Sequence, residues 1–274
     1  MSDTLRNRAL VFIVGIPGLI TFVLVGGYLF SAFVLIVLLL ASNEIQNLSG
    51  KTPSIPLKSP LFVSMIVIVS IFHSGEINYV FPFMLLVTLI TMFIEIFRKK
   101  DNPFENVSTT LFAISWIGFL LGSMILVRNS TPFGIESTFS KFITLAMFIS
   151  VWACDTFAYI FGKAFGNKKI LPRISPNKSW VGSISGVFGS IFVMSLFMYL
   201  GILKEIDLID AVIFGLIFGG FSQLGDFAES LFKRSAGVKD ASSLLMGHGG
   251  ILDRFDSLAI AAPMAYLYIK LFLG

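Results

Sequence analysis

The sequence predicts an all-α, polytopic integral membrane protein with about nine transmembrane helices and no sizeable soluble domain. Of its 274 residues, 55% are hydrophobic and only 13% are charged, whereas soluble domains carry about 25% charged residues. The apolar residues also form long runs, and a helix needs about 20 of them to cross the hydrocarbon layer. This composition excludes an ordinary soluble globule, a disordered chain and a disulfide scaffold.

Apolar runs separated by short polar segments define the expected spans. The first run, from Ala9 to Ser42, is too long for one crossing and is interrupted by Gly26-Gly27, so we divide it in two. Arg6 and Arg8 precede it as in a signal peptide, but no convincing small-residue cleavage site follows, and we expect a retained first helix. The nine spans are Ala9–Val25, Tyr28–Ser42, Pro60–Phe72, Val80–Phe97, Val107–Val127, Phe142–Phe161, Trp180–Leu200, Leu208–Phe232 and Ile251–Phe272.

Basic residues favour one side of these spans. With nine crossings, the amino terminus and the loops after spans two, four, six and eight share a side. Sixteen of the 20 Lys and Arg residues lie there with the adjoining helix ends, and four lie on the other side. The positive-inside rule places the richer side in the cytoplasm and the carboxyl terminus outside. A net charge of +4 is too small to indicate nucleic acid binding.

Acidic residues within spans are costly, at about 2.5–3.5 kcal/mol on insertion scales, and need a partner or a function. Glu95 lies one turn before Arg98, so snorkelling and an intrahelical pair explain it. Glu44, at the end of the second span, has the same interpretation. Asp155 lies about two turns before the cytoplasmic end of the sixth span, with Tyr159 on the same face. We interpret Asp155 as part of a site wall or of the surroundings of a metal ion, the alternative being an ion pair with a lysine of another helix.

The cytoplasmic end of the eighth span carries Asp226, Glu229 and Lys233 along one helical face, since their spacing is i, i+3 and i+7. A salt-bridged stripe is the alternative to a functional role. Glycines in spans seven and eight allow another backbone to approach closely, so we expect both spans to pack tightly against neighbouring helices. These glycines are Gly182, Gly186, Gly189, Gly215, Gly219, Gly220 and Gly225.

The segment from Ser230 to Ser257 combines cations, a glycine turn and carboxylates. His248-Gly249-Gly250 predicts a tight turn that lets the backbone approach a ligand. Asp253 and Asp256 are spaced i, i+3, and with Asp226 they would form a three-carboxylate cluster at the membrane surface. Cationic donors for phosphate oxygens are Lys233, Arg234, Lys239 and Arg254.

Carboxylates beside a basic cluster suit Mg²⁺ and a polyphosphate. The chain has only two histidines, His73 and His248, which excludes a histidine-rich zinc site. It has no Walker-type phosphate loop and no Gly-x-Ser-x-Gly elbow. Its single cysteine, Cys154, lies in an apolar run, where a packing role is expected. Without a persuasive nucleophile, the pattern favours phosphoryl or nucleotidyl transfer, in which an ionised phosphate of the acceptor attacks directly.

These residues resemble the signature of the CDP-diacylglycerol synthases, also called phosphatidate cytidylyltransferases. The family pattern is Ser-x-apolar-Lys-Arg, four residues, Lys-Asp, then a spacer to His-Gly-Gly-apolar-x-Asp-Arg-apolar-Asp. Met246 stands where the family usually carries Pro, and the resemblance covers roughly Val151 to the carboxyl terminus, with supporting segments at Asp155–Tyr159 and Ser175–Gly182. Matching signature positions are Ser230, Lys233, Arg234, Lys239, Asp240, His248, Gly249, Gly250, Asp253, Arg254 and Asp256.

The resemblance implies a membrane enzyme that joins CTP and phosphatidate to give CDP-diacylglycerol and pyrophosphate with Mg²⁺, the number of ions, one or two, staying open. The candidate metal ligands are Asp226, Asp253 and Asp256. The candidate catalytic residues are Asp226, Lys233, Arg234, Lys239, Asp240, His248, Asp253, Arg254 and Asp256. The candidate substrate-binding residues are Asp155, Tyr159, Ser175, Lys178, Lys233, Arg234, Lys239 and Arg254.

One membrane-embedded domain, 1–274, is expected, with amino-terminal helices in 1–150 and catalytic helices and the signature loop in 151–274. It would lie in a bacterial-type inner or plasma membrane, with CTP, phosphatidate and membrane lipids as partners and no nucleic acid. A homodimer is compatible with the family, and no residue indicates it. Two compatible roles are open for the basic loop Gly162–Lys178: orienting the protein by its positive charge, and attracting anionic headgroups.

Two other functions stay open. A transporter or channel also carries intramembrane carboxylates and glycine-rich helices, although here the polar residues concentrate at one membrane face. A related CTP-using enzyme would act on another lipid phosphate or on a polyprenol.

Overall fold

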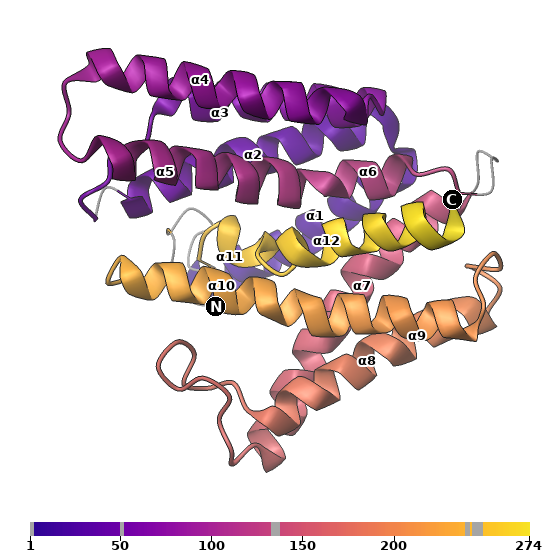
Figure 1. Ribbon diagram of the computed structural model, residues 1–274. Helices are drawn as coiled ribbons and strands as arrows, with labels where there is room; N and C mark the ends of the chain where they lie inside the picture. The colour runs from indigo at the N-terminus through magenta and orange to yellow at the C-terminus, as the bar shows by residue number, and fades with distance from the viewer. Residues whose placement is uncertain (1–2, 50–51, 133–137, 239–241, 243–248) are drawn as a thin grey trace. The chain divides into compact units, whose positions relative to one another are not determined.

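The computed structural model describes residues 3–49, 52–132, 138–238, 242 and 249–274 (Figure 1), and within the first helix it describes side chains from residue 13 onward. These residues are mostly helical. Their one β-type pairing is an isolated bridge between Lys169 and Ser179. The all-α class is therefore confirmed, and no sizeable soluble domain stands out among the residues described.

The chain divides into two compact units. Unit 1 comprises Met1–Asn129 with Lys233–Phe255, and unit 2 comprises Ser130–Phe232 with Asp256–Gly274. The boundaries of these units reflect which residues contact one another in space. The boundary expected between segments 1–150 and 151–274 was placed from sequence motifs. The grouping of both segments into one membrane-embedded domain stays a prediction.

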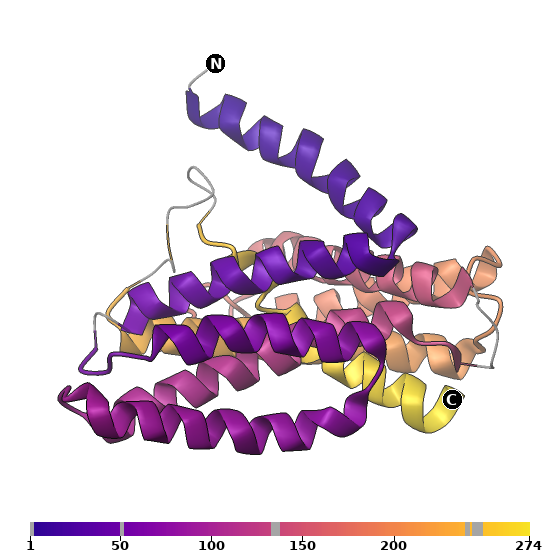
Figure 2. The same ribbon diagram turned by 90° about the horizontal axis from the view of Figure 1, so that it is seen from above.

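Unit 1 begins with α1 (Asp3–Val25) and α2 (Gly27–Ser49), which diverge from the break at Gly26 (Figure 2). Gly26 and Gly27 both have positive φ, of 70° and 52°, a conformation that favours glycine. The Arg128 guanidinium donates to the Val23 carbonyl at 2.7 Å, satisfying one of the free carbonyls at the end of α1. The expected division of the first apolar run is thus confirmed.

The remaining helices of unit 1 build a tightly packed apolar core. Phe30 and Leu38 of α2 are fully buried, as are Met65 and Ile68 of α3. The helices are α3 (Lys58–Ser74), η1 (Ile77–Tyr79), α4 (Val80–Arg98), α5 (Pro103–Ala113), the π-helical η2 (Ile114–Leu120), η3 (Leu121–Ser123), α6 (Met124–Asn129) and the short α11 (Leu252–Phe255).

Unit 2 holds the helices that carry most of the polar pocket described below. α9 begins with a capping box in which Asp207 Oδ1 accepts from the Asp210 amide at 2.8 Å and Asp210 Oδ2 from the Asp207 amide at 3.1 Å. The helices are α7 (Thr138–Phe165), α8 (Trp180–Tyr199), α9 (Leu208–Leu216), the π-helical η5 (Ile217–Phe221), α10 (Ser222–Ser235, whose residues from Lys233 onward belong to unit 1), α12 (Leu258–Tyr268) and the π-helical η6 (Ile269–Leu273).

Glycines let α8 lie close to both neighbours in unit 2. A Cβ atom at Gly182 would lie 2.7 Å from the Ala158 carbonyl oxygen on α7. On the other side, a Cβ atom at Gly219 would lie 2.8 Å from Val187 Cα on α8. The expected tight packing of the seventh and eighth spans is confirmed. Cys154 is buried in the same region, as its expected packing role requires.

The expected spans lie within helical segments to within about one residue at their ends, and three of them are divided among successive helical elements: 107–127 among α5 to α6, 208–232 among α9 to α10, and 251–272 among α11 to η6. In the described part of the chain, seven helices are long and apolar enough to cross a membrane, and two shorter apolar helices, Ile13–Val25 and Lys58–Ser74, match the first and third spans. Nine crossings therefore stay a prediction. Large apolar side chains such as Phe81, Leu89 and Phe93 on α4 are exposed, as a lipid environment requires.

Candidate active site

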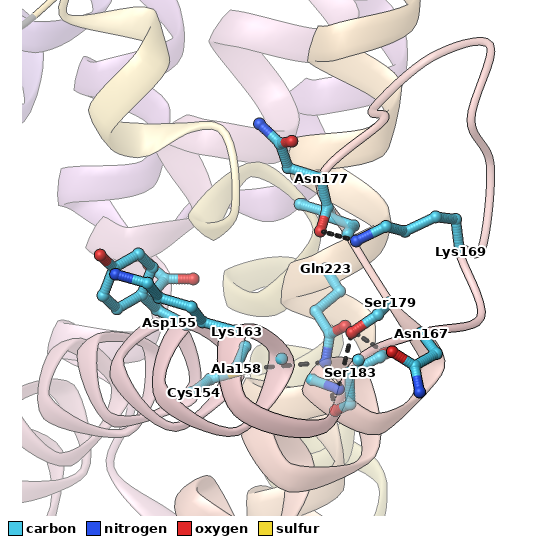
Figure 3. A pocket seen from close by; sticks show the side chains of 15 residues that line it. Cys154, Asp155, Ala158, Lys163, Asn167, Lys169, Asn177, Ser179, Ser183 and Gln223 are labelled. Atoms are coloured by element: carbon cyan, nitrogen blue, oxygen red, sulfur yellow. Dashed lines mark hydrogen bonds between the residues drawn. The ribbon is translucent and has the colours of Figure 1, made fainter.

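A polar pocket of about 560 Å³ opens in unit 2 (Figure 3). The end of α7 contributes Asp155 and Lys163, and the loop of residues 166–179 contributes Lys169 and Asn177, on the other side of the view in Figure 3. Amide, hydroxyl, cationic and carboxylate groups thus face one space at the ends of apolar helices. The lining residues that carry polar side chains are Asp155, Tyr159, Lys163, Asn167, Lys169, Asn177, Lys178, Ser179, Ser183 and Gln223.

The loop of residues 166–179 is shaped by its own backbone. The Ile170 amide donates to the Lys178 carbonyl at 3.1 Å, and the Trp180 amide donates to the Lys168 carbonyl at 3.1 Å. Ser179 then caps α8, because its hydroxyl accepts from the Gly182 amide at 3.2 Å. These bonds hold Lys178 at the pocket wall.

Gln223 on α10 forms a rigid part of the pocket. Its Nε2 donates to the Gly219 carbonyl at 2.7 Å and to the Ser183 carbonyl at 3.1 Å, and its Oε1 accepts from the Ser183 hydroxyl. Gln223 was not among the site residues expected from the sequence, although it is a lone amide among the apolar and glycine residues of its span.

Lys178 forms an ion pair with Asp226 of α10. The Lys178 ammonium also lies 4.4 Å from the centre of the Phe227 ring, and Asp226 Oδ1 accepts from the Ser230 hydroxyl at 3.4 Å. Because Lys178 lines the pocket, the ion pair connects the pocket wall to the Asp226 carboxylate.

Asp256, which directly follows α11, lies near the ion pair of Lys178 and Asp226. It is 6% exposed, and its Oδ1 accepts from the Ser257 amide at 2.5 Å. Asp226, Lys178 and Asp155 lie within electrostatic reach of its carboxylate. We call Asp155, Lys178, Asp226 and Asp256 the Asp226 cluster. Asp155 and Lys178 of this cluster line the pocket, and Asp226 is joined to it through its ion pair with Lys178.

Unit 1 contains a second group of signature residues. Lys233 Nζ lies 2.5 Å from Asp253 Oδ1, and the two side chains are only 10% and 13% exposed. Asp253 Oδ2 accepts from the Gly250 amide at 2.6 Å. Gly249 has a φ of 80°, a conformation that favours glycine; His248, the first residue of the expected turn, lies outside the described residues.

Arg234 is held where α10 ends. The Val238 amide donates to the Lys233 carbonyl at 2.9 Å and the Gly237 amide to the Arg234 carbonyl at 3.0 Å, which is a Schellman motif with Gly237 at φ 69°. Arg234 Nη1 donates to the Val238 carbonyl at 2.9 Å. The guanidinium therefore folds back over the helix end.

The predictions for two acidic residues of unit 1, Glu95 and Glu44, fare differently in the structure. Glu95 pairs with Arg98 at 3.2 Å within its helix, as expected. The interpretation of Glu44 as a snorkelling side chain is wrong: it is 1% exposed and accepts hydrogen bonds from the backbone amides of Ile251 and Leu252, each at 2.8 Å. Sequence spacing cannot show such a contact, because the partners lie at opposite ends of the chain.

Besides Asp226, Asp256, Lys233, Arg234 and Asp253, the predicted site residues lie in several different places. Asp155, Tyr159 and Lys178 line the pocket, whereas Ser175 does not; it stands in the preceding turn, where its carbonyl accepts from the Lys178 amide at 3.4 Å. Arg254 is exposed on α11. Residues outside the described part of the chain are Lys239, Asp240 and His248.

The three carboxylates of the expected metal site have different surroundings in the structure. Asp226 and Asp256 belong to one cluster of unit 2, and Asp253 is engaged by Lys233 and Gly250 in unit 1. Within the described ranges, no three Asp, Glu, His or Cys side chains lie close enough to hold one ion. A shared metal site of Asp226, Asp253 and Asp256 stays a prediction.

Comparison with known proteins extends the similarity to almost the whole chain. Residues 6–272 match the sequence model of a family described as the cytidylyltransferase family. A phosphatidate cytidylyltransferase of Synechocystis is 31% identical over 294 residues, covering 97% of each chain. A protein of the same name from Staphylococcus aureus strain COL is 34% identical over 266 residues, covering 95% of this chain and 97% of the relative.

A third protein of that name, from Haemophilus influenzae, is 42% identical over 131 residues, or 46% of each chain. The likeness is thus not confined to the part after Val151, and the amino-terminal half shares more than hydrophobicity.

Proposed function

Because this chain belongs to the cytidylyltransferase family, an enzyme family, we propose that it transfers CMP from CTP to phosphatidate, giving CDP-diacylglycerol and pyrophosphate. The chain is an integral membrane protein, and the family assignment disfavours the transporter alternative. One structural observation supports the proposal most: a cation-lined polar pocket adjoins the Asp226 cluster at the ends of apolar helices.

The pocket suits a nucleotide or a lipid phosphate. Its volume of about 560 Å³ falls within the roughly 300–1,000 Å³ of small-molecule sites. Lys163, Lys169 and Lys178 supply ammonium groups for phosphate oxygens. Exposed apolar side chains next to the lining residues, such as Ile160 and Ile184, would face the acyl chains of a lipid substrate.

The reaction needs no protein nucleophile. A phosphate oxygen of phosphatidate would attack the α-phosphorus of CTP, forming the new P–O bond as the bond to the bridging oxygen of the β-phosphate breaks and pyrophosphate leaves. Negative charge accumulates on the phosphoryl oxygens in the transition state, and the Lys178 ammonium, fixed at the pocket wall, would stabilise it.

Asp226 and Asp256 fit a role in holding Mg²⁺. Two neighbouring carboxylates match the preference of this ion for one or two carboxylates completed by substrate phosphates and water. When bound, Mg²⁺ would supply positive charge to the phosphates of CTP. Asp253 stays the proposed third ligand, and the number of ions stays open.

The orientation follows from charge. Lysines of the basic loop line the pocket, and the positive-inside rule puts this loop in the cytoplasm, where CTP is found. We propose a cytoplasmic active site in a bacterial inner or plasma membrane, with the amino terminus inside and the carboxyl terminus outside. Anionic headgroups would be attracted to the same loop.

An assay of the purified protein in detergent tests the proposal. The protein receives labelled CTP, phosphatidate and Mg²⁺, and label in the organic phase is compared with released pyrophosphate. We expect matched amounts of both products, and none with EDTA. If label is transferred only to another lipid phosphate, that lipid and not phosphatidate is the substrate. If folded protein transfers label to no lipid phosphate, the proposed transferase activity is refuted.

A matched pair of variants links the product to the site. Asp226→Asn should remove product formation, because it deletes a carboxylate of the Asp226 cluster. Asp207→Asn serves as control: Asp207 lies in the same unit in the capping box of α9, and Asn also caps helices well. Equal activity of the two variants would remove Asp226 from the site.

A further inference from the structure

The carboxylate of Glu44 lies against the signature turn of unit 1. Glu44 is on α2 near its carboxyl-terminal end, and α11, which begins at Leu252, packs on that helix. Glu44 Oε1 accepts from the Ile251 amide and Oε2 from the Leu252 amide, each at 2.8 Å, and the Ser242 hydroxyl donates to Oε1 at 2.6 Å. A side chain from the amino-terminal helices therefore binds the signature segment directly.

These bonds replace an ordinary helix cap. The first amides of a helix have no intrahelical partner and need an acceptor. At α11, Glu44 serves the amides of Ile251 and Leu252, and Asp253 reaches back to serve the Gly250 amide at 2.6 Å. The carboxylates of Glu44 and Asp253 together accept from three consecutive amides. The position of the Glu44 side chain therefore constrains the backbone of this turn.

Gly250 makes this approach feasible. A Cβ atom at Gly250 would lie 2.5 Å from Glu44 Oε2 and 2.7 Å from Oε1, far closer than non-bonded atoms tolerate. The second glycine of the signature thus serves the contact with Glu44. The first glycine, Gly249, supplies the positive φ of the turn.

The same turn also orients the Asp253 side chain. With its Oδ2 bonded to the Gly250 amide, Asp253 presents Oδ1 to Lys233 Nζ at 2.5 Å. A shift of the turn would move Asp253 relative to Lys233. Displacements of about 1 Å in catalytic geometry can cost about 100-fold in rate.

We propose that Glu44 is a positioning residue of the transfer reaction, which anchors the turn of residues 249–253 so that Asp253 faces Lys233. The inference rests on the proposed function for its kinetic consequence. Its structural half, anchoring of the Ile251 and Leu252 amides, is independent of any activity.

The test compares Glu44→Gln with Glu95→Gln in the full-length protein in detergent. Glu95 is the matched control: it is also a buried glutamate of unit 1, and its carboxylate accepts from Asn106 Nδ2 at 2.6 Å and from Arg98 Nη1 at 3.2 Å. Amide exchange of the peptide spanning residues 249–255 is followed by mass spectrometry, alongside kcat, KM for CTP and the melting temperature.

In Glu44→Gln, we expect this peptide to exchange about tenfold faster, and kcat to fall about 30-fold or more while KM for CTP changes less than about threefold. Glu95→Gln should lower the melting temperature at least as much, without either effect. Glu44→Asp keeps the charge but withdraws the carboxylate by one methylene group, so it should behave like Glu44→Gln.

Two results would overturn the inference. One is unchanged exchange of residues 249–255 in Glu44→Gln; the other is equal loss of kcat in Glu95→Gln at equal melting temperature, which indicates general destabilisation. If wild-type protein transfers no CMP at all, the proposed function fails, and the exchange comparison still decides whether Glu44 anchors the turn.

Discussion

Lys178 and Asp226 form an ion pair that connects the loop before α8 to α10. The two residues belong to different sequence motifs, and each has a second contact on α10: the Lys178 ammonium lies over the Phe227 ring, and Asp226 accepts from Ser230. In the proposed reaction, Lys178 would exchange this partner for a substrate phosphate. The ion pair therefore holds a cationic donor in place before substrate binds.

Lys178→Ala should lower kcat/KM about 100-fold, because it removes a charge-assisted donor from the transition state. Lys168→Ala, in the same loop but not among the pocket-lining residues, is the control and should stay within about twofold of wild type. Steady-state kinetics with varied CTP and phosphatidate check this. If kcat/KM falls equally in both variants, the loss reflects the positive charge of the loop in general and not a specific role of Lys178.

Asp253→Asn should reduce turnover by about 100-fold or more, while Asn Oδ1 can still accept from the Gly250 amide and keep the turn. Because Asp253 and Lys233 are bonded to one another, their losses should not add. The double variant Asp253→Asn/Lys233→Met should be no slower than the slower single variant. Additive losses in kcat would show that the two side chains act independently.

Gly225→Ala should destabilise the protein by about 1–3 kcal/mol, the usual cost of overpacking. A Cβ atom there would collide with the Asp256 carbonyl and displace a residue of the Asp226 cluster, so activity should fall too. Gly220→Ala is the control, since nothing lies within 4 Å of its Cβ position. Thermal melts and the transfer assay should separate the two alanine variants, and matching melts would contradict the close approach.

Gln223→Leu should lower the melting temperature and raise KM for CTP. The substitution leaves the Ser183 hydroxyl and carbonyl without their partner in the pocket, and such a loss costs about 1–3 kcal/mol per buried group. Gln223→Glu keeps the size and can still accept from the Ser183 hydroxyl, so its melting temperature should lie nearer to wild type. An unchanged KM in Gln223→Leu would place the nucleotide away from this wall.

The membrane fold followed from composition and hydrophobic runs. The expected spans coincide closely with helical segments because apolar length is a local property of the chain, and the break at Gly26-Gly27 was equally local. The signature residues Lys233 and Asp253 were identified from spacing, yet their mutual bond was not expected. Spacing places residues on one helix, and it does not say which partner from elsewhere each will meet.

The contacts of Glu44 and Gln223 could not be predicted from the sequence. The sequence by itself determined the helical membrane class and the approximate positions of the helices, and it identified the signature segment, because hydrophobicity and residue type act locally. Only the tertiary structure decided that Glu44 binds the Ile251 and Leu252 amides, that Lys178 meets Asp226, and that Gln223 braces the pocket. These contacts join residues far apart in the chain, and their energies depend on burial and hydrogen-bond geometry that exist only once the helices have packed.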